Sequence, residues 1–218
     1  MITISEKIKE IVKDSLLLEE GLLMGIINLS ALARQIKPQI ESALIKDISE
    51  SAVLMALKRF SKNLNRRKIK KEDFLKNIND IIVRSNLNEY TFLNSESIFK
   101  NQRLLLHAVE GVKDKFLTFT QGIFESTIIA SSKISDEIEK IFSGEKLILR
   151  LSNLSAITMK LSPEILHTPG VYYSILKQLA WNNINVIEVV STSNEFTIIL
   201  EKDNIDTAFS VLMNSLAK

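Results

Sequence analysis

The stretch HTPGVYYSILKQLAWNNINVIEVVSTSNEFTIIL, residues 167–200, decides the fold of the C-terminal part of the chain. Its first half carries apolar residues at helical spacing, which predicts a helix at 170–182. Two apolar, β-branched runs follow at 185–191 and 196–200 and indicate strands. The pair Ser193-Asn194 between them is typical of a turn. The stretch therefore predicts a helix followed by a β-hairpin.

Helices and strands also alternate on both sides of this stretch. A strand at 154–161 precedes the stretch and a helix at 205–216 follows it, which gives the order β-α-β-β-α. The preceding residues repeat this order and add a final strand; the predicted strands are 89–93, 116–120, 125–130 and 146–151, and the predicted helices are 95–109 and 134–142. Two units with one element order indicate an internal duplication, and split β-α-β units of this kind build a ferredoxin-like layer.

The second unit lacks its last strand, so one edge of its sheet would be unpaired. The short β-branched run at 81–84 precedes the first unit and has no partner there. We expect this run to complete the second unit, so that the two units are interleaved. The predicted fold class is α+β: a helical domain at 1–76, then units at 77–153 and 154–218.

Three pieces of the second unit resemble the ACT domain, most closely the C-terminal regulatory ACT domains of aspartokinases. They are the strand Leu154–Met159, the helix entry His167–Val171 and the segment Asn183–Ser193. Residues 80–153 match only in element order and look like a degenerate ACT unit. The resemblance implies interleaved units, as expected above, and pairing of such sheets in a homodimer.

The resemblance also implies that a small amino acid binds between a partner unit and the loop that joins the first strand of the second unit to the helix at 170–182. Pro169 fixes the entry to that helix, and Gly170 lets the backbone approach a ligand. Free N–H groups at a helix start suit a carboxylate. Asn183, after the helix, tolerates a left-handed conformation. The implied ligand residues are His167, Thr168, Pro169, Gly170, Val171, Asn185, Val186, Ser191 and Thr192. ACT-like units that serve only to pair chains remain the alternative.

No catalytic or metal constellation stands out. A phosphate-binding glycine loop and the G-x-S-x-G motif are both absent, and only about 76 helical residues precede the ACT-like units, so we predict that the chain is not an aspartokinase. The histidines, His107 and His167, lie in different units, and there is no cysteine. We therefore expect no enzyme activity, no metal and no cofactor.

The N-terminal domain is predicted to contain helices at 5–18, 31–36, 38–44 and 50–64, followed by a basic connector at 65–71. The segment NLSALARQI, residues 28–36, resembles the first helix of a helix-turn-helix, with 50–64 as its recognition helix. The spacing is a weakness, because residues 37–48 intervene where such motifs use a turn of about 3–4 residues.

The distribution of charge favours a local nucleic-acid-binding surface over a generally basic protein. The chain holds 28 Lys and Arg against 26 Asp and Glu, yet nine basic and two acidic residues lie between Lys58 and Lys76. Lysines and arginines there could neutralise DNA phosphates. The predicted DNA-binding residues are Lys58, Arg59, Lys62, Arg66, Arg67 and Lys68.

No signal-peptide core or membrane-spanning run is present, so a cytoplasmic protein is expected. The leading hypothesis is a non-enzymatic, amino-acid-sensing regulator of transcription. The alternative is a regulatory or scaffold subunit that docks on a metabolic enzyme through the helical domain and uses its ACT units for oligomerisation.

Overall fold

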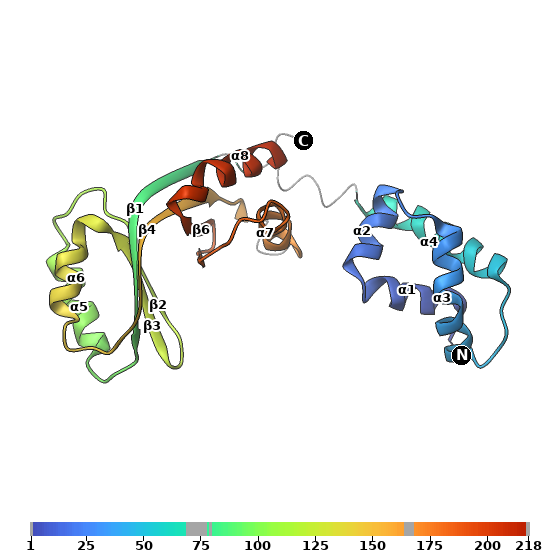
Figure 1. Ribbon diagram of the computed structural model, residues 1–218, viewed down its shortest axis with the longest axis horizontal. Coiled ribbons are helices and arrows are strands. Elements are labelled where there is room, and N and C mark those ends of the chain that lie inside the picture. Colours follow the sequence, from blue (N-terminus) through green and yellow to red (C-terminus); the bar gives the residue numbers. More distant parts are fainter. Residues whose placement is uncertain (1, 69–77, 79, 164–167, 217–218) are drawn as a thin grey trace. The chain divides into compact units, whose positions relative to one another are not determined.

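The computed structural model describes every residue except 1, 69–77, 79, 164–167 and 217–218. The chain divides into two compact units, Met1–Asp73 and Phe74–Lys218. The described part of the first contains only helices, and the second contains all the described strands (Figure 1). We call them the helical unit and the sheet unit.

The helical unit is built from α1 (Ile4–Lys13), α2 (Leu16–Met24), α3 (Leu29–Leu44) and α4 (Glu50–Lys68). Side chains satisfy the N–H groups at helix starts: Thr3 and Glu6 cap α1 reciprocally, and the side chain of Asn28 accepts from the second and third amides of α3. The apolar faces meet in one core that comprises Ile8, Val12, Leu22, Leu32, Ala33, Ile36, Ile40, Val53, Ala56, Leu57 and Leu64.

Two helix boundaries in this unit were predicted wrongly. The predicted helix at 5–18 is two helices, because Ser15 interrupts it and caps α2 by accepting a hydrogen bond from the third amide of that helix. The predicted break before Pro38 does not occur, and α3 continues through it. Proline removes one helical hydrogen bond, but Ile36 and Ile40 are buried on either side and keep the helix packed on the core.

The basic connector predicted at 65–71 begins inside a helix, since α4 extends to Lys68. The connection between α3 and α4 is also shorter than predicted. It comprises only residues 45–49, because α3 fills most of the gap predicted at 37–48. The joint is therefore close in length to a helix-turn-helix turn.

The sheet unit contains six strands in the order β2-β3-β1-β4-β6-β5, and every neighbouring pair is antiparallel. Its elements are β1 (Ile81–Leu93), α5 (Ile98–Ala108), β2 (Leu117–Gln121), β3 (Glu125–Ser131), η2 (Ser132–Ile134), α6 (Ser135–Ile141), β4 (Leu147–Lys160), α7 (Val171–Trp181), β5 (Glu188–Ser191), β6 (Glu195–Glu201), η4 (Lys202–Asn204) and α8 (Ile205–Leu216). The predicted α+β class with interleaved ferredoxin-like units is confirmed.

β1 and β4 are long enough to serve both ferredoxin-like halves. Residues 87–93 of β1 pair with β3 and with the start of β4, which completes the first half. Residues 81–84 pair with 156–159 of β4, on the side where the second half has no strand of its own. Each half packs its two helices over a separate core (Figure 1), α5 and α6 over the first and α7 and α8 over the second.

Each of the two long strands was predicted as two shorter ones, and the structure joins them. A left-handed asparagine lies at each predicted break: Asn86 has a φ of 60° and Asn153 a φ of 58°. The ladder shifts register beside both residues but does not end, as at a β-bulge. Ser-Asn-Leu occurs at both points, a short repeat that could have revealed the duplication.

Paired threonines mark the duplication a second time. The hydroxyls of Thr91 and Thr127 lie 3.0 Å apart on adjacent strands of the first half, and those of Thr158 and Thr197 lie 2.8 Å apart in the second. Each pair joins the first and third strands of its half at matching register. The two halves thus repeat in detail as well as in element order.

Candidate effector-binding site

The predicted ligand loop enters α7 through a glycine in the left-handed conformation. Gly170 has a φ of 88° and is the N-cap of α7. Glycine adopts this φ without strain, and it has no side chain to cover the first N–H groups, which lack intrahelical partners. Thr168 is half-buried, Pro169 is exposed, and Val171 is buried under the helix. His167 lies outside the described residues.

Tyr172 links this loop to the end of β5. Its hydroxyl lies 2.9 Å from the hydroxyl of Ser191, and its ring stacks on Phe196 with centroids 4.6 Å apart. Thr192 is the next residue, and its hydroxyl accepts from the amide of Glu195. The start of α7 and the predicted residues Ser191 and Thr192 therefore lie together. The sequence analysis missed Tyr172, whose signal was a hydroxylated aromatic directly after Pro-Gly-Val.

Asn185 and Val186 lie at the other end of α7. The helix ends at Trp181, and Asn183, with a φ of 56°, turns the chain toward β5 in the left-handed conformation predicted for it. An 11-residue helix at 1.5 Å per residue spans about 16 Å. One chain therefore does not bring Asn185 and Val186 to the Gly170 loop.

The first half has a different arrangement at the start of α5. The carboxylate of Glu145 accepts hydrogen bonds from the Ser95 hydroxyl (2.6 Å), the Ser97 hydroxyl (2.6 Å) and the Asn101 amide (2.7 Å). The chain thus places its own carboxylate where a ligand carboxylate could approach this helix. The sequence analysis missed Glu145 because 44 or more residues separate it from the groups that it contacts.

Two carboxylates lie on the sheet face opposite the helices. Glu89 and Glu188 are the backbone partners of Ile129 and Ile199, which belong to a small core on that face. Only 5% of Glu89 is exposed, and its Oε2 has no hydrogen-bond partner among the described residues. A charged residue between apolar strand neighbours was the signal available in the sequence.

Burial controls the ionisation of this pair. It raises the pKa of Glu89, and the negative charge of Glu188 raises it further. Burial also raises the pKa of Glu188, and a hydrogen bond from Thr120 partly offsets the increase.

In the helical unit, hydrogen bonds lower the pKa of two carboxyl groups instead of raising it. A hydrogen bond from the backbone amide of Thr3 lowers the pKa of Glu6, and one from the amide of Ile48 lowers the pKa of Glu41. Glu6 is exposed and Glu41 is half-buried. Their charged forms are favoured by folding, whereas the charged forms of the buried pair in the sheet unit are disfavoured.

We expect the two units to respond to pH in opposite directions. A Glu with a raised pKa stabilises the fold below its ordinary value of about 4.5 and loses this contribution as pH rises through the raised value. A Glu with a lowered pKa contributes stability above the ordinary value and loses it as pH falls. Lowering the pH from 7 toward 4.5 should therefore stabilise the sheet unit against denaturant and leave the helical unit nearly unchanged, whereas lowering it below 4.5 should destabilise the helical unit.

The unfolding transitions of the two units can be told apart. Fluorescence of the single tryptophan, Trp181, reports on the sheet unit, while circular dichroism reports on the helices of both units. Glu89→Gln should flatten the pH dependence of the sheet unit, and Glu125→Gln, at an exposed position on the same sheet, should leave it unchanged. An identical slope in wild type and Glu89→Gln would contradict the assignment.

The candidate DNA-binding residues lie on α4. Lys58, Arg59 and Lys62 are exposed, on the side of the helix away from the buried Val53 and Leu57. Within the described residues none of the three forms an ion pair. The backbone of Arg66, Arg67 and Lys68 continues the helix, and their side chains lie outside the description.

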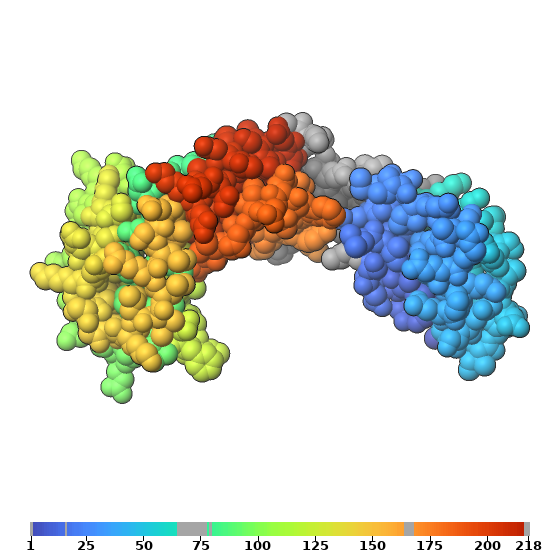
Figure 2. Space-filling model, in the orientation of Figure 1, coloured from blue at the N-terminus to red at the C-terminus, as the bar shows by residue number. Residues whose placement is uncertain are grey.

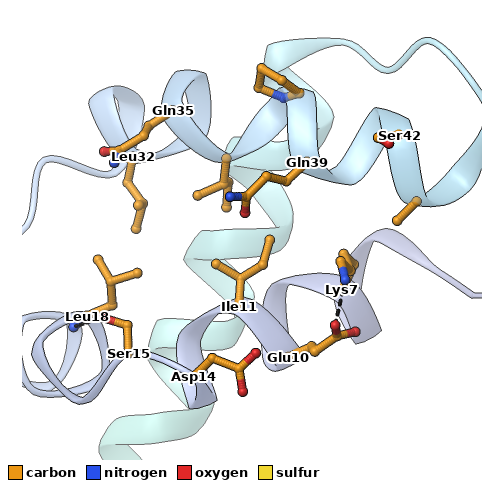
Figure 3. A pocket seen from close by; sticks show the side chains of 13 residues that line it. Lys7, Glu10, Ile11, Asp14, Ser15, Leu18, Leu32, Gln35, Gln39 and Ser42 are labelled. Atoms are coloured by element: carbon orange, nitrogen blue, oxygen red, sulfur yellow. Dashed lines mark hydrogen bonds and ion pairs between the residues drawn. The ribbon is translucent and has the colours of Figure 1, made fainter.

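A groove of about 810 Å³ runs along the helical unit between α1, α2 and α3 (Figure 3). Apolar side chains, including Ile11, Leu18 and Leu32, point into it, and Asp14 and Gln35 are among its polar residues. This groove could not be predicted from the sequence, because it depends on how three helices pack.

Within the described residues, no group of three or more His, Cys, Asp or Glu could hold a metal ion. The search of the same residues finds no helix that combines the length and the apolar character of a membrane span.

Comparison with known proteins identifies the fold of the sheet unit. No model of a known protein family matches the chain, and no curated protein matches its sequence. Solved structures do match. The aspartate kinase of Clostridium acetobutylicum has a TM-score of 0.53 and 15% identity, over 64% of this chain and 35% of that one.

The regulatory subunit of aspartate kinase from Thermus thermophilus has a TM-score of 0.51 and 9% identity, over 63% of this chain and 97% of that one. E. coli aspartokinase III, solved in complex with lysine and aspartate, has a TM-score of 0.51 and 9% identity, over 65% of this chain and 33% of that one. The chain therefore spans about a third of the length of the two kinases. The matches lie in the C-terminal part of the chain, and the resemblance to the aspartokinase ACT pair is confirmed at the level of the fold.

Proposed function

We propose that this chain is a non-enzymatic regulatory protein that senses a small amino acid through its second ACT-like half. The observation that carries the proposal is the start of α7 at Gly170, where no described side chain caps the helix and where the hydroxyl of Tyr172, in the first turn, meets that of Ser191. The equivalent helix start in the first half holds Glu145 instead. The first half thus places a carboxylate of its own at the helix start, whereas no described side chain caps the start of α7.

An amino acid fits this position chemically, because helix N–H groups favour a carboxylate. That E. coli aspartokinase III was solved with lysine and aspartate supports the same class of ligand. The proposed contacts in one chain are His167, Thr168, Pro169, Gly170, Val171, Ser191 and Thr192. Asn185 and Val186 would contribute from a partner unit.

The proposed output is DNA binding by the helical unit, as in a ligand-responsive transcriptional regulator. The short joint at 45–49 and the exposed cations Lys58, Arg59 and Lys62 on α4 support it. Arg66, Arg67 and Lys68 would extend the basic surface. An amino acid that favours one arrangement of the protein should change DNA affinity by about 5–150-fold.

Replacing Lys58, Arg59 and Lys62 together with glutamine should weaken binding to duplex DNA. Each lost phosphate contact should also reduce the slope of log affinity against log salt by about 0.9, because fewer counterions are released. The measurement is a fluorescence-anisotropy titration of the full chain at several salt concentrations, with and without the amino acid.

The matched control replaces three exposed cations of the sheet unit, Lys100, Arg103 and Lys113, with glutamine, and DNA affinity should then change little. Absence of wild-type binding at about 50 mM salt, where phosphate contacts are strong, would overturn the DNA proposal but not the amino-acid proposal.

The groove between α1 and α3 favours a second candidate function. A regulatory subunit could use it to bind an apolar segment of a metabolic enzyme, with the ACT-like halves used for oligomerisation. Salt-insensitive binding of an enzyme, lost on Leu18→Asp in the groove but retained in the α4 triple variant, would favour this function over DNA binding.

A further inference from the structure

A cleft of about 400 Å³ lies in the sheet unit where β4 passes from the first half to the second. Its apolar lining comes from Leu154, Leu151 and Ile187, which belong to or pack against the small core on the face opposite the helices. Figure 2 shows the yellow-orange part of the chain that contains β4 bordering the red part that follows β6. Leu151 pairs with the first half, whereas Ile187 and the residues after β6 belong to the second. An occupant of the cleft would therefore contact both halves.

The polar lining of the cleft carries two carboxylates and one ammonium group. Glu201 is the last residue of β6, and Lys202 and Asp203 begin the turn η4 that follows. All three residues are exposed. None of their side chains forms an ion pair or a hydrogen bond with another residue that the structure describes. Their charges are therefore available to a ligand, and together they leave the cleft with a net negative charge.

The first half shows that the repeated fold does not require these charges. Ser131 and Glu201 hold the same position, because each pairs with the leucine that follows the left-handed asparagine of its half. The equivalent turn of the first half, residues 131–133, reads Ser-Ser-Lys and contains no carboxylate. The hydroxyl of Ser131 accepts a hydrogen bond from the amide of Phe116, 2.8 Å away. The carboxylates at the cleft are thus an addition to the fold of the second half.

The lining of the cleft selects a class of ligand. Its volume lies within the range of about 300–1,000 Å³ that is usual for small-molecule sites. The net negative charge disfavours phosphates and dicarboxylates. A primary ammonium group suits Glu201 and Asp203, since hydrogen bonds between charged groups are the strong ones. The branched apolar side chains favour a small hydrocarbon body beside that ammonium group, and Ser152 and Asn153 add neutral hydrogen-bonding groups.

We infer that this cleft is a second ligand site, which binds a small molecule that joins a primary ammonium group to a branched apolar body. A simple amine and an apolar amino acid share this chemistry, and Lys202 would add affinity for the carboxylate of an amino acid. The cleft shares no lining residue with the proposed effector contacts at α7. The inference therefore goes beyond the proposed function and does not depend on it.

Isothermal titration calorimetry of the full chain with isoamylamine tests the cleft alone, because this probe has no carboxylate for the N–H groups at the start of α7. Isoamylamine should bind more tightly than isovalerate, which has the same apolar body and no ammonium group. Glu201→Gln combined with Asp203→Asn should raise the Kd for isoamylamine at least about tenfold, the loss expected for hydrogen bonds between charged groups. The matched control, Glu125→Gln with Glu195→Gln, changes two exposed carboxylates elsewhere on the sheet and should leave the Kd unchanged.

L-Leucine, titrated into Gly170→Ala, distinguishes the two sources of the ammonium group. Binding tighter than that of isoamylamine, and weakened by Lys202→Gln, would identify an amino acid; weaker binding would identify a simple amine, and either result supports the site. Isoamylamine that does not bind, binds no better than isovalerate, or binds equally to the Glu201 and Asp203 double variant would overturn the inference and leave the α7 proposal standing. Loss of amino-acid binding at α7 with isoamylamine binding retained would instead support the cleft and contradict only the proposed function.

Discussion

Replacing Phe196 with alanine is expected to lower the free energy of unfolding of the sheet unit by about 3–5 kcal/mol. Phe196 is only 1% exposed and lies in β6, within the core under α7 and α8. Truncation would lose its transfer free energy and leave a cavity that the flanking strands β4 and β5 cannot fill. The loss would also remove the ring that supports Tyr172, at 4.6 Å and an interplanar angle of 13°.

Phe99→Ala is the matched control, because Phe99 is 63% exposed on α5. This variant should stay within about 0.5 kcal/mol of wild type. Denaturant unfolding of both variants, followed by Trp181 fluorescence, provides the measurement. Equal effects of the two substitutions would show that β6 is not in the core of this unit.

The α+β class and the interleaving could be predicted because they depend on local periodicity and on one missing strand. The run at 81–84 had no partner near it, and the second unit had an unpaired edge. What could not be predicted was that β1 and β4 each continue through a predicted strand end. Asn86 and Asn153 look like strand ends in the sequence and have a left-handed φ, yet β1 and β4 stay paired on either side of them.

The candidate site was predicted in part, for a similar reason. Pro169-Gly170 signals a turn before a helix, and the turn is found there. The contact between Tyr172 and Ser191 depends on how α7 lies across β5, and that between Glu145 and Ser95 on a loop 50 residues away. Such contacts come from tertiary packing, which local patterns do not encode.

The second large effect expected is stabilisation of the protein by a bound amino acid. An amino acid at 100 times its Kd should stabilise the protein by about 2.7 kcal/mol. For a unit of this size the melting temperature should then rise by roughly 5–10 °C. The response should depend on the start of α7. Gly170→Ala puts a side chain at a φ of 88°, which strains the loop, and Tyr172→Phe removes the hydroxyl that meets Ser191.

Gly111→Ala is the control for the glycine substitution. A Cβ there meets nothing within 4 Å, and the φ of Gly111 is not in the left-handed range. This variant should keep the full ligand response. A loss of response in Gly111→Ala as well would mean that general destabilisation, and not the conformation at Gly170, accounts for the effect.

The most direct test of the sensing proposal is therefore thermal unfolding of the full chain in the presence of each proteinogenic amino acid at millimolar concentration. At least one amino acid should raise the melting temperature, and Gly170→Ala and Tyr172→Phe should diminish the rise. If no amino acid moves the melting temperature, or if the rise is unchanged in both variants, the second ACT-like half is not an amino-acid sensor at this site.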